Sequence, residues 1–373
     1  MSEATDHEAA AAEATLEVTS PGAMSTVQDL GRPAWRRIGV PRAGALDPAL
    51  LRIANVLAGN AQTAPAIEFF VAGPTLKAVD QPVCVGLAGD FPATLTRAIG
   101  ERTQIGSWRS VTLLPGDTLR AGQVSSSRVG YVAVAGLAVP RVLGSASTYA
   151  RASLGGHGGR ALAAGDKLTA AAAAQRHGER PAQRMLRRPP AQTLTPASAP
   201  IRVVPGPQAD HFTEATLAEF FGAAYRVSAD ADRMGVRLQG TPLTHRADKG
   251  AEIVSDATVP GSIQVPGNGL PIVLLADGQT AGGYPKIGTV ASCDLARLAT
   301  APVGAELRFE AVTVAQAEAL ARDAEDALQA LLATIKPLLL DGDIDLNAIY
   351  STNLVSGMID ARCPERIDPW TST

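Results

Sequence analysis

The chain has 373 residues, of which 46% are hydrophobic and 18% are charged, and its formal net charge is −3. This length favours two domains over a single small core. The weak net charge gives no reason to expect nucleic acid or an anionic membrane as a partner, and no apolar run reaches the ~18 residues of a membrane span. Three dispersed cysteines and five histidines without ligand spacing argue against a disulfide framework or a zinc site.

The N-terminal part of the chain is predicted to be a leader followed by a β-rich lobe. Residues 1–15 are acidic and alanine-rich, which predicts a disordered leader, and the absence of a signal-peptide pattern favours a cytoplasmic location. Residues 16–168 form the predicted lobe, with glycine-punctuated, β-branched strands at 83–90 and 129–136. One helix is predicted from Asp47 to Leu57, because Asp47 suits its N-cap, Pro48 its first turn and Gly59 its end.

A basic linker, a second β-rich lobe and a helical tail are predicted to follow. Residues 169–200 are rich in Arg, Pro and Ala, which is typical of a solvated linker, with an anion-binding arm as the alternative. Residues 201–312 form the second lobe and include a short helix starting at Thr213. The tail, 313–373, opens with a capping box of Thr313 and Gln316 and continues with apolar residues at helical spacing. Pro337 is expected to end or kink this helix, and a second short helix is predicted beyond it. We interpret the tail as a packing or dimerisation element.

The segment 260–298 carries the strongest functional signal. An apolar, strand-like run, 271–276, lies between stretches rich in Gly, Pro and amide side chains, and it is followed by Asp277, Gln279, Tyr284 and Lys286. Polar groups on turn-forming backbone behind a buried strand are typical of a site on a rigid scaffold. Lys286 and Tyr284 suit proton transfer or oxyanion stabilisation. The alternative is an ordinary β-hairpin.

Further candidates are charged residues in apolar or glycine-rich surroundings, notably Arg42, Asp47, Arg233 and Arg237. Arginines at turns can clamp a carboxylate or a phosphate, although ion pairs that fix loops are the alternative. The sequence contains no phosphate-binding loop, dinucleotide fingerprint or nucleophile elbow. It therefore does not predict a self-sufficient nucleotide-dependent or covalent enzyme.

Six motifs together carry a family resemblance: TVQDLGRP, GVPRAGALD, STYARASLGG, PGPQ, DRMGVRL and GGYPKIGTV. With them, the chain resembles the KipA-type proteins, which are also called the C-type subunits of 5-oxoprolinase. That family is similar to the second allophanate-hydrolase subunit and to part of the carboxyltransferase domain of urea carboxylase. The resemblance runs from about Leu16 to Val312 and implies a mainly β fold with two cyclophilin-like β-barrel lobes, here followed by the helical tail.

The resemblance also implies an activity, partners and site residues. The chain would be one subunit, inactive alone, of an ATP-dependent 5-oxoprolinase that opens 5-oxoproline to glutamate with ATP and Mg²⁺. Its partners would be a KipI-type protein (the B-type subunit of 5-oxoprolinase) and a LamB/YcsF-type protein (the A-type subunit of 5-oxoprolinase). Under this hypothesis the cationic side chains hold phosphates, and Asp277 or Asp47 holds Mg²⁺ or directs a water. The resemblance assigns substrate or nucleotide binding to Arg42, Asp47, Arg233, Arg237 and Gln264, and catalysis to Asp277, Gln279, Tyr284 and Lys286.

Two other functions stay open on the sequence. The first is a biotin-dependent carboxyltransferase component that acts on urea or a related amide, which avidin would inhibit. The second is a non-enzymatic regulator that binds a KipI-type kinase inhibitor. The polar groups concentrated in the segment 260–298 favour an enzyme subunit over a regulator.

Overall fold

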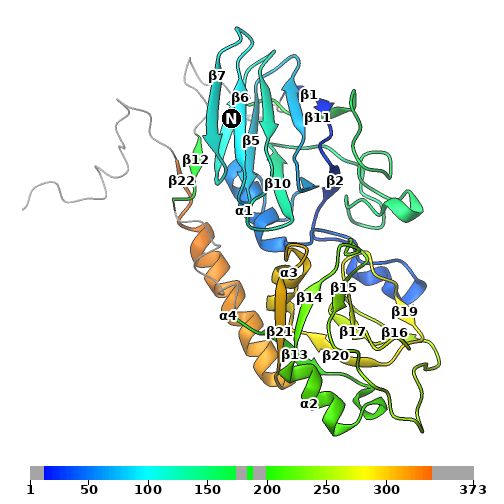
Figure 1. Ribbon diagram of the computed structural model, residues 1–373. Coiled ribbons are helices and arrows are strands. Elements are labelled where there is room, and N and C mark those ends of the chain that lie inside the picture. The colour runs from blue at the N-terminus through cyan, green and yellow to red at the C-terminus, as the bar shows by residue number, and fades with distance from the viewer. Residues whose placement is uncertain (1–11, 174–182, 188–198, 338–373) are drawn as a thin grey trace, which may run out of the picture. The chain divides into compact units, whose positions relative to one another are not determined.

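The computed structural model describes residues 12–173, 183–187 and 199–337 (Figure 1). These residues form a mostly β structure with a closed seven-stranded barrel in the C-terminal half, which confirms the predicted fold class. Within the described part of the chain, no helix combines the length and the apolar character that a membrane crossing requires. The second helix predicted in the tail lies beyond residue 337, outside the described residues.

The N-terminal half encloses its core between two antiparallel sheets. The strands of the six-stranded sheet are, in spatial order, β11 (Lys167–Ala171), β1 (Glu13–Ser20), β4 (Thr75–Ala78), β9 (Thr118–Ala121), β6 (Pro92–Thr96) and β7 (Arg102–Gly106). The strands of the seven-stranded sheet are β2 (Met24–Gln28), β3 (Ala66–Phe70), β10 (Val129–Val134), β5 (Val83–Ala88), β8 (Arg109–Leu113), β12 (Arg184–Met185) and β22 (Lys336–Pro337). In β1, Leu16 and Val18 are fully buried while Thr15 and Glu17 are not, as one buried face requires.

Helix α1 (Pro48–Ala58) covers the outer face of the seven-stranded sheet, which is why β5 and β10 are buried along their whole length. The predicted helix ends are confirmed: the Asp47 carboxylate accepts hydrogen bonds from the first turn, and Gly59 ends the helix in the left-handed conformation. The buried side of the helix includes Leu51, Ile53 and Leu57.

The C-terminal half forms the closed barrel. Its strands in spatial order are β13 (Ile201–Pro205), β20 (Lys286–Val290), β17 (Ser262–Gln264), β18 (Ile272–Leu274), β15 (Gly235–Gln239), β14 (Ala224–Val227) and β21 (Glu306–Ala311). The core includes fully buried Val236, Ile263 and Val273, and Phe220 of α2 (Glu214–Gly222) stacks on Phe309 with ring centroids 4.8 Å apart. Thr213 caps α2, as its sequence predicts.

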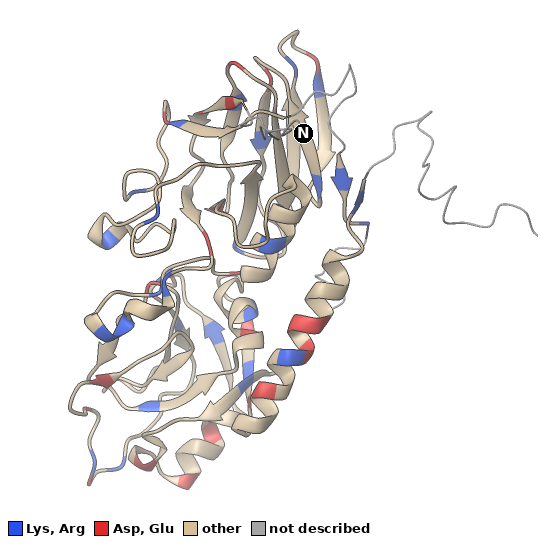
Figure 2. Cartoon of the chain, turned by 180° about the vertical axis from the view of Figure 1, so that it is seen from behind, with Lys and Arg blue, Asp and Glu red and all other residues tan. Residues whose placement is uncertain are grey.

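Helix α4 (Val314–Leu332) follows the barrel and packs against elements of both halves (Figures 1 and 2). The capping box of Thr313 and Gln316 is present as predicted. Arg52 of α1 makes a bidentate ion pair with Glu325 of α4, with both nitrogen–oxygen distances at 2.7 Å. Leu328 and Leu332 are the buried residues of the helix, and Figure 2 marks its acidic positions in red along its length.

Two segments differ from their predicted character. Strand β1 begins at Glu13, inside the range expected for a disordered leader, because its backbone pairs with β11 from that residue onward. Arg184 and Met185, inside the predicted linker, form β12, and Met185 pairs with Arg109 at the edge of β8. Long-range strand pairing, which composition does not reveal, orders both segments.

Candidate functional site

A cleft of about 430 Å³ lies on the outer surface of the barrel. In β15 the side chains of Val236 and Leu238 point into the core, so Arg237 between them points outward and is exposed. Arg237 is the Cα partner of Ile272 in β18, and Ile272 is the partner of Gln264 in β17. Directly paired residues of neighbouring antiparallel strands place their side chains on the same face. The pairing register therefore brings Arg237 and Gln264 to one surface.

Four of the nine predicted site residues line this cleft: Arg237, Gln264, Gln279 and Tyr284. The Gln279 Nε2 group donates to Gln264 Oε1 at 3.0 Å, which fixes the orientation of both amides. The Gln264 Nε2 donor is buried and has no hydrogen-bond partner among the described residues. Because an unpaired buried donor is costly, it points to a ligand acceptor at this position.

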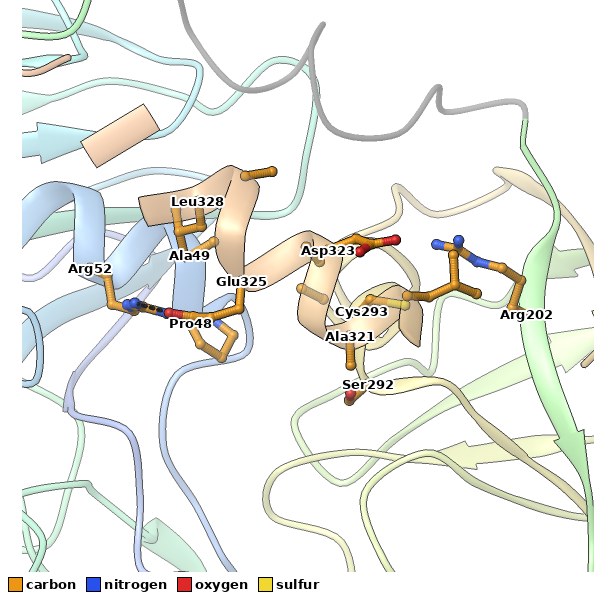
Figure 3. A pocket seen from close by; sticks show the side chains of 14 residues that line it. Pro48, Ala49, Arg52, Arg202, Ser292, Cys293, Ala321, Asp323, Glu325 and Leu328 are labelled. Carbon is orange, nitrogen blue, oxygen red and sulfur yellow. Dashed lines mark hydrogen bonds and ion pairs between the residues drawn. The ribbon is translucent and has the colours of Figure 1, made fainter. Parts of the chain in front are cut away.

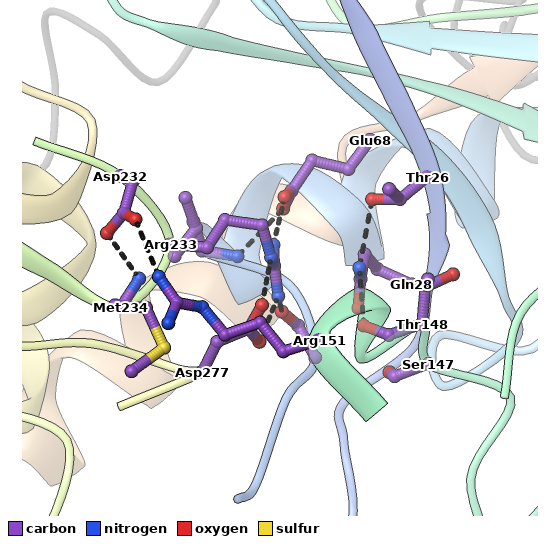
Figure 4. Close-up of polar contacts among 12 residues, drawn as sticks. Thr26, Gln28, Glu68, Ser147, Thr148, Arg151, Asp232, Arg233, Met234 and Asp277 are labelled. Carbon is purple, nitrogen blue, oxygen red and sulfur yellow. Dashed lines mark hydrogen bonds and ion pairs between the residues drawn. The ribbon is translucent and has the colours of Figure 1, made fainter. Parts of the chain in front are cut away.

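The rim of the cleft includes a residue from the N-terminal half. Arg151, in the short 3-10 helix Ala150–Ala152, lines the cleft, is exposed, and lies 3.8 Å from Asp232 across the boundary between the two halves (Figure 4). No side-chain partner of Arg237 occurs among the described residues, and Arg151 has only this long contact. Two guanidinium groups beside amide donors form an arrangement that suits a small anion with a carbonyl oxygen.

Arg233 occupies a different place, in a buried ion network that joins the two halves (Figure 4). Its Nε and Nη2 groups donate to the two oxygens of Asp277, both at 3.0 Å, and Nη1 donates to Glu68 of β3. Nη2 also donates to the Gly44 carbonyl at 2.7 Å. Gly44 has a φ of 91°, which favours glycine, and a side chain there would collide with the Gly31 backbone. Glycine therefore allows the turn that presents this carbonyl to Arg233. We call this network of Glu68, Arg233, Asp277 and the Gly44 carbonyl the junction.

The junction pairs one guanidinium group with two carboxylates. Burial acts against the charged guanidinium, but the carboxylates of Glu68 and Asp277 outweigh it and raise the pKa of Arg233. Glu68 also accepts hydrogen bonds from the Leu46 backbone N–H and from the Tyr131 hydroxyl. Burial and the nearby Glu68 charge raise the pKa of Tyr131 well above its usual value, so this residue remains a neutral donor. The predicted site residues Arg233 and Asp277 are thus engaged with each other and with the N-terminal half, away from the lining of the cleft.

Asp47 is likewise placed in a structural position, as the N-cap of α1. Its Oδ1 accepts from the backbone N–H groups of Ala49 and Leu50, both at 3.0 Å. Burial raises the pKa of Asp47 to about 6, an effect that the two backbone hydrogen bonds only partly offset. Its carboxylate is therefore committed to the helix, and it does not line the cleft.

Lys286 lies next to the cleft without lining it. It is the Cα partner of Gln264 in β20, it is only 3% exposed, and its ammonium group contacts Asp256 at 2.7 Å. Tyr284, two residues earlier, is 40% exposed and lines the cleft. The predicted catalytic set is thus divided: Gln279 and Tyr284 lie in the cleft, Lys286 behind it and Asp277 in the junction.

Arg42 lies in a separate groove of about 210 Å³ with apolar walls, beside α3 (Ser292–Ala299). Its Nε donates to the Leu30 carbonyl at 3.3 Å. A larger hollow of about 510 Å³ adjoins it between α1, α3 and α4 (Figure 3). None of the nine predicted site residues lines this hollow, and its arginines, Arg52 and Arg202, are paired with Glu325 and Asp294. The cleft on the barrel is therefore the better candidate for a functional site.

Three important residues were absent from the predicted site set. Arg151 and Glu68 stand out as charges in apolar or glycine-rich contexts, but their positions relative to the cleft and the junction depend on long-range strand pairing. Asp256 gives no sequence signal at all. Its importance follows only from its contact with Lys286. Within the described residues, no group of three or more His, Cys, Asp or Glu side chains is arranged to hold a metal ion.

Known proteins resemble this chain in architecture and in sequence. The chain is 34% identical to the 5-oxoprolinase C subunit of Haemophilus influenzae over 312 residues, which cover 83% of this chain and 95% of that protein. The crystal structure of TTHA0988 matches with a TM-score of 0.67 at 37% identity, covering 81% of this chain and 57% of that one. The urea amidolyase structure from K. lactis matches with a TM-score of 0.74 at 27% identity, covering 88% of this chain and 20% of that one.

The family described as "Carboxyltransferase domain, subdomain A and B" matches residues 38–311, which include the cleft, the junction and Lys286. That match covers most of the chain, and the H. influenzae protein aligns over nearly its full length. On this basis, the chain belongs to the carboxyltransferase domain family of subdomains A and B.

Proposed function

We propose that this chain is the C-type subunit of an ATP-dependent 5-oxoprolinase and acts in a complex with a KipI-type and a LamB/YcsF-type subunit, in the cytoplasm. The observation that carries the proposal is the cleft, which brings together Arg237, Arg151 and the Gln264 Nε2 group, which has no partner among the described residues. The 5-oxoprolinase C subunit of H. influenzae, similar along most of this chain, supports the same activity.

The chemical groups of the cleft suit 5-oxoproline, which carries a carboxylate and a ring amide. In the proposal, the Arg237 guanidinium binds the carboxylate through two parallel hydrogen bonds, and Arg151 adds positive charge at the rim. The Gln264 Nε2 group donates to the amide carbonyl oxygen, and this hydrogen bond strengthens as negative charge develops on that oxygen. Tyr284 supplies a hydroxyl group at the same wall of the cleft.

The nucleotide and its metal are not assigned to this chain. ATP would supply a phosphoryl group that makes the poorly reactive amide open to attack by water. The described residues offer no grouped set of metal ligands, and Asp47 and Asp277 are held by the α1 N-terminus and by Arg233. We therefore propose that Mg²⁺–ATP binds chiefly to the partner subunits.

Co-expression of the three subunits provides the test. ATP hydrolysis and glutamate release from 5-oxoproline are measured for the complete mixture and with each subunit omitted in turn. Activity that requires all three subunits is the expected result. A well-formed complex that neither hydrolyses ATP nor releases glutamate would refute the proposal.

Carboxyl transfer to urea or a related amide is the second candidate. It is favoured by the match to urea amidolyase, because the K. lactis structure superposes over 88% of this chain. The same cleft would then bind a carbonyl group at Gln264 without needing a carboxylate at Arg237. The two functions are separated by adding biotin carrier, bicarbonate and urea to the complex: inhibition by avidin supports carboxyl transfer, and indifference to avidin supports lactam opening.

A further inference from the structure

Lys286 is the fourth member of a row of side chains that begins in the cleft. The pairing register places Arg237, Ile272, Gln264 and Lys286 side by side across β15, β18, β17 and β20, with an irregularity between Ile263 and Gln264 that skips one residue of β20 and brings Lys286 opposite Gln264. Neighbouring strands lie about 4.8 Å apart, so the side chains of Gln264 and Lys286 start next to each other on the same surface. The first three members line the cleft, whereas Lys286 does not.

A small two-stranded element separates Lys286 from the cleft. Strands β16 (Asp256–Ala257) and β19 (Ala281–Gly282) pair with each other, and we call residues 253–258 and 279–284 the flap. Asp256 receives the Lys286 ammonium at 2.7 Å and the Gln208 side-chain amide at 3.2 Å. Gly282 lies directly against Gln264, where a side chain would come within 2.3 Å of the Nε2 atom. The flap therefore covers Lys286 and also contacts the unpartnered donor of the cleft.

The first strand of the flap makes few contacts outside the flap. Asp256 and Ala257 are exposed, and among the described residues this strand has only β19 as its strand partner. Gly250 and Gly261, both with positive φ, flank this stretch of chain and permit a change of backbone direction. The rest of the flap is held more firmly, because Arg36 donates to the carbonyls of Thr258 and Gln279 at 2.6 and 3.3 Å and the Gln279 amide donates to Gln264. Local rearrangement at low cost is therefore expected of the exposed strand that carries Asp256.

We propose that Lys286 is a further anion-binding residue of the cleft, and that an anionic group of the ligand exchanges for the Asp256 carboxylate that now holds it. The ligand's identity rests on the proposed function, and its chemical class is a small carboxylate or phosphate. Asp256 is then a positioning residue: it keeps Lys286 oriented and neutralised until the ligand arrives.

The exchange is favoured by the different surroundings of the two charges. A buried ammonium group without a partner is strongly destabilising, so Lys286 requires an anion at every stage. Its side chain is 3% exposed, but that of Asp256 is 48% exposed and turns into water with little loss. Ligand binding thus substitutes one anion for another, and the released Asp256 carboxylate is solvated at once.

Amine labelling of the full chain tests the first half of this proposal. Reductive methylation with formaldehyde and cyanoborohydride, followed by peptide mass spectrometry, reports the reactivity of each lysine. In the wild type, Lys286 should react much more slowly than Lys249, which is 40% exposed and paired with Asp210. Asp256→Asn should speed Lys286 labelling about tenfold, because the ammonium loses its charged partner while the flap keeps its size and shape, and Asp256→Glu should restore slow labelling.

Asp210→Asn is the matched control, because it removes the same kind of ion pair from an exposed lysine and should leave Lys286 labelling unchanged. Slow labelling of Lys286 in a folded Asp256→Asn variant would overturn the proposal, since burial alone would then protect it. Gln208→Ala provides a second variant, which removes a hydrogen bond to Asp256 without changing its charge and one from the Lys286 backbone N–H, and it should speed labelling to a smaller extent.

The assembled complex tests whether Lys286 binds an anionic group of the ligand. 5-Oxoproline and inorganic phosphate are each added to the complex carrying Asp256→Asn, and the anion that slows Lys286 labelling identifies the group that takes the place of the Asp256 carboxylate. Protection by neither anion would overturn the proposal. In turnover, Asp256→Asn should lower KM several-fold at unchanged kcat, because a competing anion is removed, whereas a purely structural role predicts a lower kcat. A complex without turnover would refute the proposed function, but the labelling contrast would stand.

Discussion

Arg233 and Arg237 lie four residues apart in one motif, yet the structure uses them in opposite ways. Arg233 is 7% exposed, and its Nε, Nη1 and Nη2 groups all donate hydrogen bonds, to carboxylates of both halves and to the Gly44 carbonyl. Arg237 is exposed on the outer surface of β15, and its guanidinium has no partner among the described residues. The sequence around the two arginines, DRMGVRL, does not distinguish them.

The difference shows how to separate a structural charge from a binding charge. A buried arginine that has all its partners within the chain has no hydrogen bonds left for a ligand, and removing it leaves buried carboxylates uncompensated. An exposed arginine in a cleft contributes little to stability and keeps its donors for an anion. Arg233 therefore stabilises the junction, and Arg237 is the residue available to a ligand.

Replacing Arg233 should have the largest effect in this comparison. Arg233→Met should lower the free energy of unfolding by about 3–5 kcal/mol, because Glu68 and Asp277 would remain buried without a cation. Urea denaturation followed by circular dichroism measures this loss. Arg237→Met, the matched change four residues away, should alter the unfolding free energy by less than about 0.5 kcal/mol.

A triple variant sharpens this test. Arg233→Met combined with Glu68→Gln and Asp277→Asn removes the charges together and should recover part of the lost stability, since no uncompensated charge remains. Equal stability of the wild type and Arg233→Met would show that the junction contributes nothing to holding the halves together. In that case, Arg233 would again be a candidate ligand-binding residue.

Arg237 should dominate the activity measurement instead. In the three-subunit complex, Arg237→Met should lower kcat/KM for 5-oxoproline about 100-fold, equivalent to about 2.7 kcal/mol, because the carboxylate loses its bidentate partner. Arg226→Met, which changes another exposed arginine of the same barrel, is the control and should leave activity unchanged. Full activity of Arg237→Met would remove the basis for placing the substrate carboxylate in the cleft.

Local features of the fold could be predicted from sequence because their causes are local. The Asp47 cap, the Thr213 cap and the capping box of Thr313 each depend on residues within a few positions of one another. The start of β1 at Glu13 could not be predicted in this way, because its partner strand lies about 150 residues later in the chain.

The candidate site was predicted only in part, for the same reason. Gln279 and Tyr284 follow β18 in the turn-rich sequence, and both line the cleft on the barrel. Which arginine enters the cleft depends on strand register, and a shift of one residue would have exchanged the two faces of β15. The contact between Lys286 and Asp256 joins segments 30 residues apart and leaves no local pattern.

Asp47 provides the test with the smallest expected effect. Its carboxyl group caps α1, and among the described residues no cation forms an ion pair with it. Its pKa is raised to about 6 in the folded protein, mainly by burial, from an ordinary value of 3.8. The folded state therefore binds more protons than the unfolded state between these values, and the contribution of Asp47 to stability falls as pH rises through about 4 to 6. Asp47→Asn keeps an oxygen for the cap and abolishes this titration.

The expected result is a difference between Asp47→Asn and the wild type that depends on pH. At pH 7 the variant should be the more stable protein by about 1–2 kcal/mol, and this advantage should shrink toward pH 4, where the wild-type carboxyl is protonated. Asp166→Asn should behave oppositely: Arg160 lowers the pKa of Asp166 to about 2, so its carboxylate stabilises the fold at neutral pH and loses this effect in acid. Urea denaturation of both variants at several pH values measures the two differences. A pH-independent difference between Asp47→Asn and the wild type would mean that hydrogen bonds fully compensate the buried Asp47 carboxylate. Buried carboxylates without an ion pair would then cost no more stability than paired ones.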